Sequence, residues 1–91
     1  MAESIIKRKT NNPIKSKQIS SGITINANGY NYVLDESLAG KNFQGYQIGG
    51  LAGKNVTIGQ VYINSGGAYV VLINNSNVNI TTGEIKFYYT D

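Results

Sequence analysis

A chain of 91 residues and 9.8 kDa has room for one small domain. It contains no cysteine and no histidine, which excludes disulfides, thiolate metal sites and catalysis by a histidine base. The remaining five carboxylates, eight basic residues and seven tyrosines point to no particular reaction. We therefore expect a protein that is not an enzyme and that needs no cofactor and no metal.

The positive charge is concentrated near the N-terminus. Residues 1–18 carry five basic residues and one acid, whereas residues 19–91 carry three lysines and four acids, so the net charge of +3 is the sum of +4 and −1. This asymmetry predicts a flexible or partner-bound basic arm over residues 1–18 and a folded domain over residues 19–91. The arm residues expected to bind a partner are Lys7, Arg8, Lys9, Lys15 and Lys17.

The rest of the chain is typical of short β-strands joined by tight turns. Isoleucine, valine, threonine and tyrosine suit a pleated sheet, and the many asparagines and glycines suit turns. Residues 23–25 and 30–34 are predicted as strands of one hairpin, because the Asn-Gly signature lies in the turn 26–29 between them. Residues 35–53 are rich in Gly, Lys and Asn and are expected to form an irregular crossover or a single short strand.

A second hairpin is predicted in the last third of the chain. Residues 55–63 form its first strand, with a bulge near Gly59, and residues 64–67 form its turn. Residues 68–73 are apolar at every position, as in a strand that is buried on both faces.

The C-terminal segment completes the expected fold. Residues 74–79 are predicted as a polar loop, with Ile80 anchored in the core, and residues 84–90 as a strand with alternate apolar side chains on one face. The result is an all-β fold: a small antiparallel β-sandwich or jelly-roll-like barrel of about six to eight strands, preceded by the extended basic arm.

Size alone predicts association. The scaling for this mass gives about 5,000 Å² of apolar surface buried on folding, worth ~130 kcal/mol, against ~135 kcal/mol of chain entropy. The isolated monomer is therefore marginal. With no disulfide available, we expect stabilisation by a homo-oligomer or by a larger assembly.

Candidate binding residues come from two features. Tyrosine is in excess, and a phenol beside Asn or Gln amides can stack on a sugar ring or contact a protein. Several tyrosines are expected in the core, namely Tyr30 or Tyr32 together with Tyr69 and Tyr89. This leaves Tyr46, Tyr62 and Tyr88 as surface candidates. The segment Leu38–Asn42 repeats as Leu51–Asn55. This identity predicts two similar Gly-Lys turns or, alternatively, related loops that present Lys41 and Lys54 on one edge.

Two stretches resemble a known class of proteins. Residues 61–76, VYINSGGAYVVLINNS, and residues 82–89, TGEIKFYY, are similar to the ends of tailed-bacteriophage fibre and baseplate receptor-binding proteins. The segment 23–34 is similar to the opening of such domains. The resemblance implies a virion accessory protein with a small β-sandwich head or tip domain, in which the arm serves for attachment.

The leading hypothesis is thus a structural or adhesive module of a phage particle, at the baseplate, fibre tip or capsid surface. Its expected partners are copies of itself, with a trimer favoured, other virion proteins and a host-surface glycan. The alternatives are a small nucleic-acid-binding β-barrel that uses the arm and a free carbohydrate-binding module. No signal peptide or membrane-spanning run is evident, so we expect synthesis in the host cytoplasm, virion association and no membrane insertion.

Overall fold

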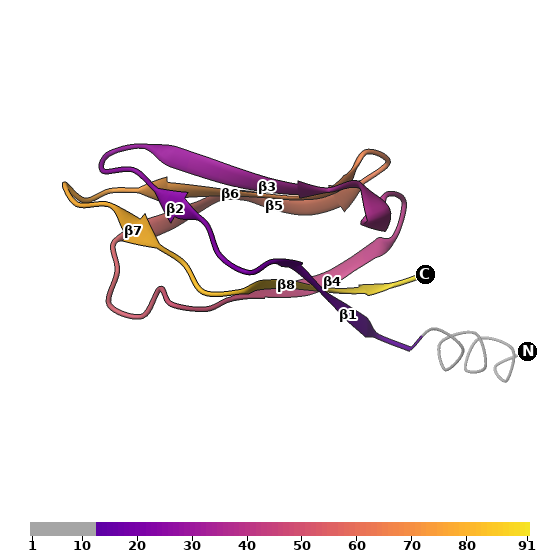
Figure 1. The fold of residues 1–91 in the computed structure, drawn as a ribbon. Helices are drawn as coiled ribbons and strands as arrows, with labels where there is room; N and C mark the ends of the chain where they lie inside the picture. The colour runs from indigo at the N-terminus through magenta and orange to yellow at the C-terminus, as the bar shows by residue number, and fades with distance from the viewer. Residues whose placement is uncertain (1–12) are drawn as a thin grey trace, which may run out of the picture.

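The computed structural model describes residues 13–91, which form two packed β-sheets and a short two-stranded ribbon (Figure 1). The predicted arm residues Lys7, Arg8 and Lys9 lie outside the described residues. The elements are, in chain order, β1 (Lys15–Ser20), β2 (Thr24–Ile25), β3 (Tyr30–Asp35), the 3₁₀ turn η1 (Glu36–Leu38), β4 (Asn42–Ile48), β5 (Val56–Asn64), β6 (Gly67–Asn74), β7 (Ile80–Thr81) and β8 (Ile85–Thr90).

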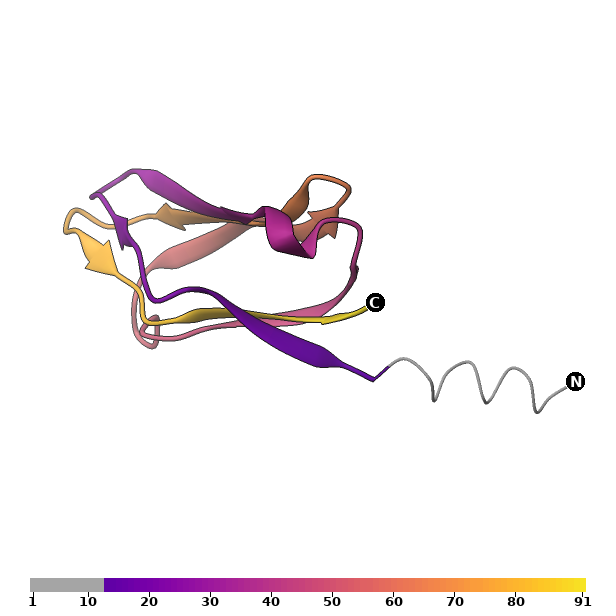
Figure 2. The same ribbon diagram turned by 45° about the vertical axis from the view of Figure 1, so that its right-hand side comes forward.

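Each large sheet has three antiparallel strands. One sheet has the order β1-β8-β4 and the other β3-β6-β5, and β2 pairs with β7 at one end of the molecule. The turned view in Figure 2 shows the two sheets as separate layers, with η1 at the end opposite to β2 and β7. The predicted all-β antiparallel sandwich is confirmed.

The core lies between the two sheets. Its buried side chains come from alternate positions of the central strands β6 and β8, as the two-residue period of a strand requires. Phe87 and Ile85 project from β8 toward the other sheet, and Val70 and Leu72 of β6 project to meet them; all four are fully buried. Ile80 is 4% exposed, so its predicted role as a core anchor is confirmed.

The first predicted hairpin is wrong in its pairing, although both strands and the turn exist. The turn is closed by the Gly29 amide, which donates to the Asn26 carbonyl at 2.9 Å. However, β2 pairs with β7 and β3 pairs with β6. The amide of Asn28 donates to Ser76, and that of Asn74 to Gly29. Contacts with the 74–79 loop therefore replace local pairing.

The second predicted hairpin is confirmed. Strands β5 and β6 pair from Asn64 opposite Gly67 to Val56 opposite Asn74, and the register shifts between Ile58 and Gln60, where the bulge was expected. The crossover predicted over 35–53 contains a longer regular element than expected, because β4 has seven residues.

The boundary predicted at residue 18 falls inside a strand. Residues Lys15–Ser20 form β1, an edge strand that pairs with the central strand β8. The last part of the predicted arm therefore belongs to the folded sandwich.

Candidate interaction surface

The outer surface of the β3-β6-β5 sheet carries three of the six large hydrophobic side chains that are exposed among residues 13–91, namely Tyr30, Tyr32 and Leu34. Seven side chains project from it away from the core, and we call this surface the tyrosine face: Tyr30, Tyr32, Leu34, Tyr62, Tyr69, Val71 and Ile73. They belong to three neighbouring strands and share one side of the sheet, because residues paired across strands point to the same side.

Strand β3 is inverted relative to the usual pattern of a surface strand. Its outward positions carry Tyr30, Tyr32 and Leu34, which are 70%, 53% and 49% exposed. Its inward positions include Asn31, whose amide donates to the Thr24 carbonyl at 2.9 Å. A strand with one face in water normally places its polar side chains there. The inversion makes the outer side of β3 a candidate binding surface.

Strand β6 contributes the centre of the tyrosine face. Its inward residues are fully buried, whereas Tyr69, Val71 and Ile73 on the outer side are half-buried. The prediction that this strand is buried on both faces is therefore confirmed for its inner face only, which the other sheet covers. The other face has only solvent over it in the isolated chain.

Three aromatic rings cross the sheet in a row. The ring centroids of Tyr32 and Tyr69 lie 5.8 Å apart, and those of Tyr69 and Tyr62 lie 5.3 Å apart, with interplanar angles of 44° and 41°. Such tilted pairs are a favoured aromatic geometry. The row therefore holds large, amphipathic side chains in fixed positions, which lowers the entropy lost when a partner binds.

The tyrosine face carries no charge. Strands β3, β5 and β6 contain one charged residue, Asp35, which faces the other sheet and is engaged there. A neutral aromatic surface is typical of the centre of a protein interface, from which charged residues are depleted.

The three tyrosines predicted as surface candidates do not gather in one place. Tyr62 belongs to the tyrosine face. Tyr88 lies in the other sheet, where its hydroxyl contacts the Gln47 side-chain oxygen at 3.0 Å. Tyr46 is 39% exposed on the edge strand β4 and stacks on Phe43 with a centroid distance of 6.4 Å.

The structure corrects part of the assignment of tyrosines to the core. Tyr89 packs against the core as expected, but Tyr69 lies on the outer face. The expectation that Tyr30 or Tyr32 fills the core is also wrong, because both are exposed, at 70% and 53%; neither is among the predicted binding residues. The signal that could have identified them is the fully apolar sequence of β6, because a neighbouring strand would share its second buried face.

The two Gly-Lys segments form the same turn at opposite ends of the sandwich. In each, the lysine amide donates to the leucine carbonyl three residues earlier, at 3.1 Å for Lys41 and 2.9 Å for Lys54. The glycines Gly40 and Gly53 have φ of +77° and +73°, as a type II turn requires. Because Lys41 leads into β4 and Lys54 into β5 at the other end, they do not form a common edge.

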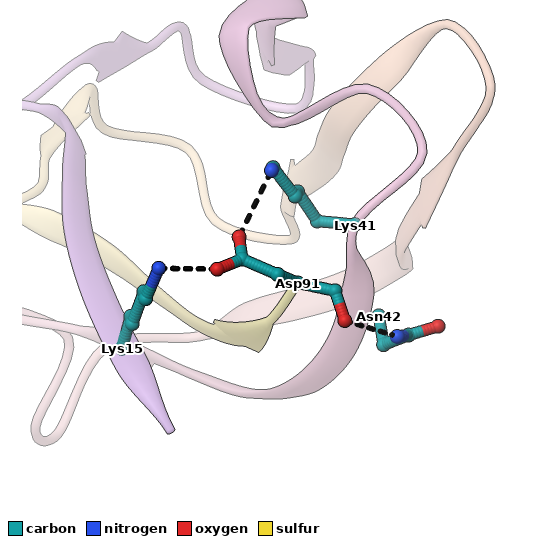
Figure 3. Close-up of polar contacts among 4 residues, drawn as sticks. All are labelled: Lys15, Lys41, Asn42 and Asp91. Carbon is teal, nitrogen blue, oxygen red and sulfur yellow. Dashed lines mark hydrogen bonds and ion pairs between the residues drawn. The ribbon is translucent and has the colours of Figure 1, made fainter. Parts of the chain in front are cut away.

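Three strands meet in an ion-pair cluster at one end of the β1-β8-β4 sheet (Figure 3). The Asp91 carboxylate binds the ammonium groups of Lys15 and Lys41, the latter at 2.9 Å. The Asn42 amide donates to the Asp91 backbone oxygen at 3.1 Å. The hydrogen bonds from Lys15 and Lys41 lower the pKa of Asp91 to about 2. Lys15 and Lys41 are thus engaged within the chain.

A second ion pair connects the two sheets. Lys17 of β1 donates to Asp35 of β3 at 2.7 Å and also to the Ser37 hydroxyl. Partial burial raises the pKa of Asp35, but the hydrogen bonds from Lys17 and Ser37 outweigh it, so this pKa lies below its ordinary value. Lys17 therefore has a structural role at the rim of the sandwich.

Other types of site are absent from the part of the chain that the structure describes. Residues 13–91 contain no surface pocket and no group of three or more potential metal-ligating acids. No helix among them is long and apolar enough to cross a membrane. The exposed features that remain are surfaces rather than cavities.

Comparison with known proteins finds no relative. No family model matches the chain, and neither a curated protein nor a solved structure matches it. The tyrosine face is therefore the feature of the molecule that bears on its function.

Proposed function

We propose that this chain is a non-enzymatic structural module that works by docking its tyrosine face on another protein subunit. The inverted polarity of β3 carries the proposal: Tyr30, Tyr32 and Leu34 face outward, while the inward positions hold Asn31, bonded to the Thr24 carbonyl of β2, Val33, packed on the core, and Asp35, bonded to Lys17. This arrangement leaves apolar surface in water in the isolated chain. Removing that surface from water is the main driving force for association.

The chemistry of the face favours a protein partner over a sugar. Leu34, Val71 and Ile73 are aliphatic and offer no hydrogen bonds to hydroxyl groups. On β5, the Thr57 hydroxyl already accepts a hydrogen bond from the Asn75 amide at 2.7 Å. A protein surface can cover aliphatic and aromatic groups together, and the tyrosine hydroxyls can remain at its hydrated rim.

Nucleic-acid binding has weaker support. The tyrosine face carries no lysine or arginine, and binding to the phosphate backbone depends on such charges. Lys15, Lys17 and Lys41 each pair with a carboxylate of the chain itself. Their positive charge is therefore partly neutralised.

The setting proposed for this module is the tailed-phage particle, at its baseplate, fibre tip or capsid surface. This part of the proposal is supported by the sequence resemblance described above. Virion association belongs to the same proposal and has the same support, and adhesion to a host glycan is the alternative that the resemblance implies.

Site-specific photo-cross-linking in the cell that makes the protein tests the docking function. A photoreactive phenylalanine analogue is placed at Tyr32, and the control carries it at Gln18, an exposed residue of β1 that pairs with Lys86 on the outside of the other sheet. We expect a protein adduct of defined mass from position 32 and none from position 18. No adduct at position 32, or equal adducts at both, would contradict the proposal; the first result would favour a glycan.

A further inference from the structure

We propose that the partner on the tyrosine face is a second copy of this chain, packed face to face across a two-fold axis that runs parallel to the strands. This inference rests on the proposed docking function and specifies its partner. Three properties of the face support it: its charge, its area and its relief.

The absence of charge allows the face to meet itself. A two-fold interface brings the same residues together from both copies, so any charged group on it would lie close to its like. The outward positions of β3, β6 and β5 are all uncharged. Association of identical faces therefore has no electrostatic penalty at the interface.

The area is sufficient for a specific pair. A tyrosine side chain buries about 150–250 Å² when fully covered, so the exposed fractions of Tyr30 and Tyr32, 70% and 53%, amount to roughly 180–310 Å². Leu34 and the half-buried side chains of β6 and β5 bring each copy to on the order of 500 Å². Two copies thus bury about 1,000 Å², the lower limit for a specific interface.

The relief of the face is uneven, and this selects the direction of the axis. Tyr30, Tyr32 and Leu34 make the β3 side high. On the β5 side, Gly59 has no side chain, and a Cβ atom there would lie 3.2 Å from Ile73 Cδ1 and 3.5 Å from Val71 Cγ1. The β5 side is therefore low at Gly59, between Thr57 and Gln60, whereas Tyr62 projects further along the same strand.

A two-fold axis parallel to the strands places Tyr30 and Tyr32 of each copy over the stretch of β5 that contains Gly59 in the other, and Leu34 over Tyr62. It lays β6 on β6 and β3 over β5. An in-plane axis perpendicular to the strands would instead bring β3 onto β3, so that the most exposed side chains of the two copies oppose one another. Aligned sheets pack about 10 Å apart with interdigitated side chains, and such packing requires this complementarity.

The strand register then predicts which residues meet. Val71 pairs with Tyr32 on one side and with Gln60 on the other, so these three residues form one row across the sheet. The two-fold axis runs parallel to β6 and lies between the two copies. Rotation about it places Tyr32 of one copy opposite Gln60 of the other. Within one copy, β6 separates these two residues. A direct contact between Tyr32 and Gln60 is therefore evidence for the dimer.

Sedimentation equilibrium of the full chain measures this association, with three variants as probes. We expect a species of twice the monomer mass of 9.8 kDa, and Tyr32→Glu should weaken association by at least about 30-fold, the effect of losing one interface anchor. The matched control Gln18→Glu adds the same charge to the opposite face and should change nothing. Adding Gln60→Lys to Tyr32→Glu should restore most of the lost affinity, because the two new charges face each other between copies.

Each other outcome has a defined meaning. A wild-type chain that stays monomeric overturns self-association, and the photo-cross-link at position 32 then decides separately whether a different protein docks there. A trimer, the state implied by the sequence resemblance, overturns the two-fold pair. Equal effects of Tyr32→Glu and Gln18→Glu overturn the choice of face. Circular dichroism of each variant at low concentration verifies that the monomer is folded.

Discussion

Asn74 provides the sharpest test of how this small sandwich is held together. Its side chain is 1% exposed at the end of β6 and makes four hydrogen bonds. The amide nitrogen donates to the carbonyls of Ile25 at 2.9 Å and Val78 at 2.8 Å, and the amide oxygen accepts from the amide and hydroxyl of Ser76. One side chain thus connects β6 to β2 and to the 74–79 loop.

Two substitutions separate the loss of these bonds from the burial of a charge. Asn74→Ala removes all four bonds. The Ser76 groups can turn to water, but the Ile25 carbonyl cannot, and an unsatisfied buried group costs about 1–3 kcal/mol. We expect Asn74→Ala to lower the free energy of unfolding by about 3 kcal/mol, out of the roughly 5–14 kcal/mol typical of a chain of this length.

Asn74→Asp keeps the shape but replaces the donor with an oxygen that faces two carbonyl oxygens. In the ionised form, the oxygen that replaces the amide nitrogen is buried and has no hydrogen-bond donor. The folded state should therefore raise the pKa of the new carboxyl well above its ordinary value of about 3.9. When protonated, the carboxyl can donate to one of the two carbonyls. At pH 7 we expect this variant to be less stable than Asn74→Ala, with a loss of about 4 kcal/mol or more.

The sign of the pH dependence follows from the raised pKa. Stability is then highest below the unfolded pKa and is lost as pH rises through the folded pKa. Urea unfolding followed by circular dichroism at pH 4 and pH 8, with the wild type measured in parallel, isolates this contribution. The deficit of Asn74→Asp should shrink by at least about 1 kcal/mol at pH 4, since each pKa unit corresponds to 1.36 kcal/mol. A deficit that equals that of Asn74→Ala and is constant with pH would refute this account.

Two further predictions concern the rim of the sandwich and one of its turns. Because hydrogen bonds from Lys17 help to lower the pKa of Asp35, the pair stabilises the fold above the unfolded pKa, and this contribution is lost as pH falls through the folded pKa. Asp35→Asn should therefore cost about 1 kcal/mol at pH 7 and almost nothing near pH 2; equal costs at both pH values in urea unfolding would contradict the role of this pair. Gly67 has φ of +136°, and a Cβ atom there would lie 2.7 Å from the Asp35 carbonyl oxygen, whereas Gly40, at +77°, has open space. Gly67→Ala should cost about 3 kcal/mol or more and Gly40→Ala about 1 kcal/mol, and thermal unfolding that ranks them equally would exclude the clash as the cause.

Local signals in the sequence predict the local structure well. The β5–β6 hairpin, the bulge after Ile58 and the two Gly-Lys turns follow from glycine positions and alternation, which act over a few residues. The pairing of β2 with β7 joins Ile25 to Ile80. Nothing near Ile25 in the chain encodes that partner, because it is chosen by closure of the whole core.

The candidate site is harder to predict, because the alternation of β3 predicts that its tyrosines and leucine are buried. Its tyrosines and leucine alternate with Asn31, Val33 and Asp35, and the usual interpretation buries the more apolar set. The structure exposes that set, since Asn31 and Asp35 have hydrogen-bond partners on the inner side. Sequence periodicity describes which residues share a face, but the partners on each face determine which one is buried.

The order of strands in the β1-β8-β4 sheet has a consequence for how the chain folds. Every pairing in this sheet joins distant segments, such as Lys15 with Tyr89 and Ile48 with Ile85. Closing such long loops is slow, whereas the β5–β6 hairpin closes a four-residue turn and forms early. Until β8 is available, β1 and β4 have no neighbour in their sheet. We therefore expect the β1-β8-β4 sheet to form after the β5–β6 hairpin, around a strand near the C-terminal end of the given sequence.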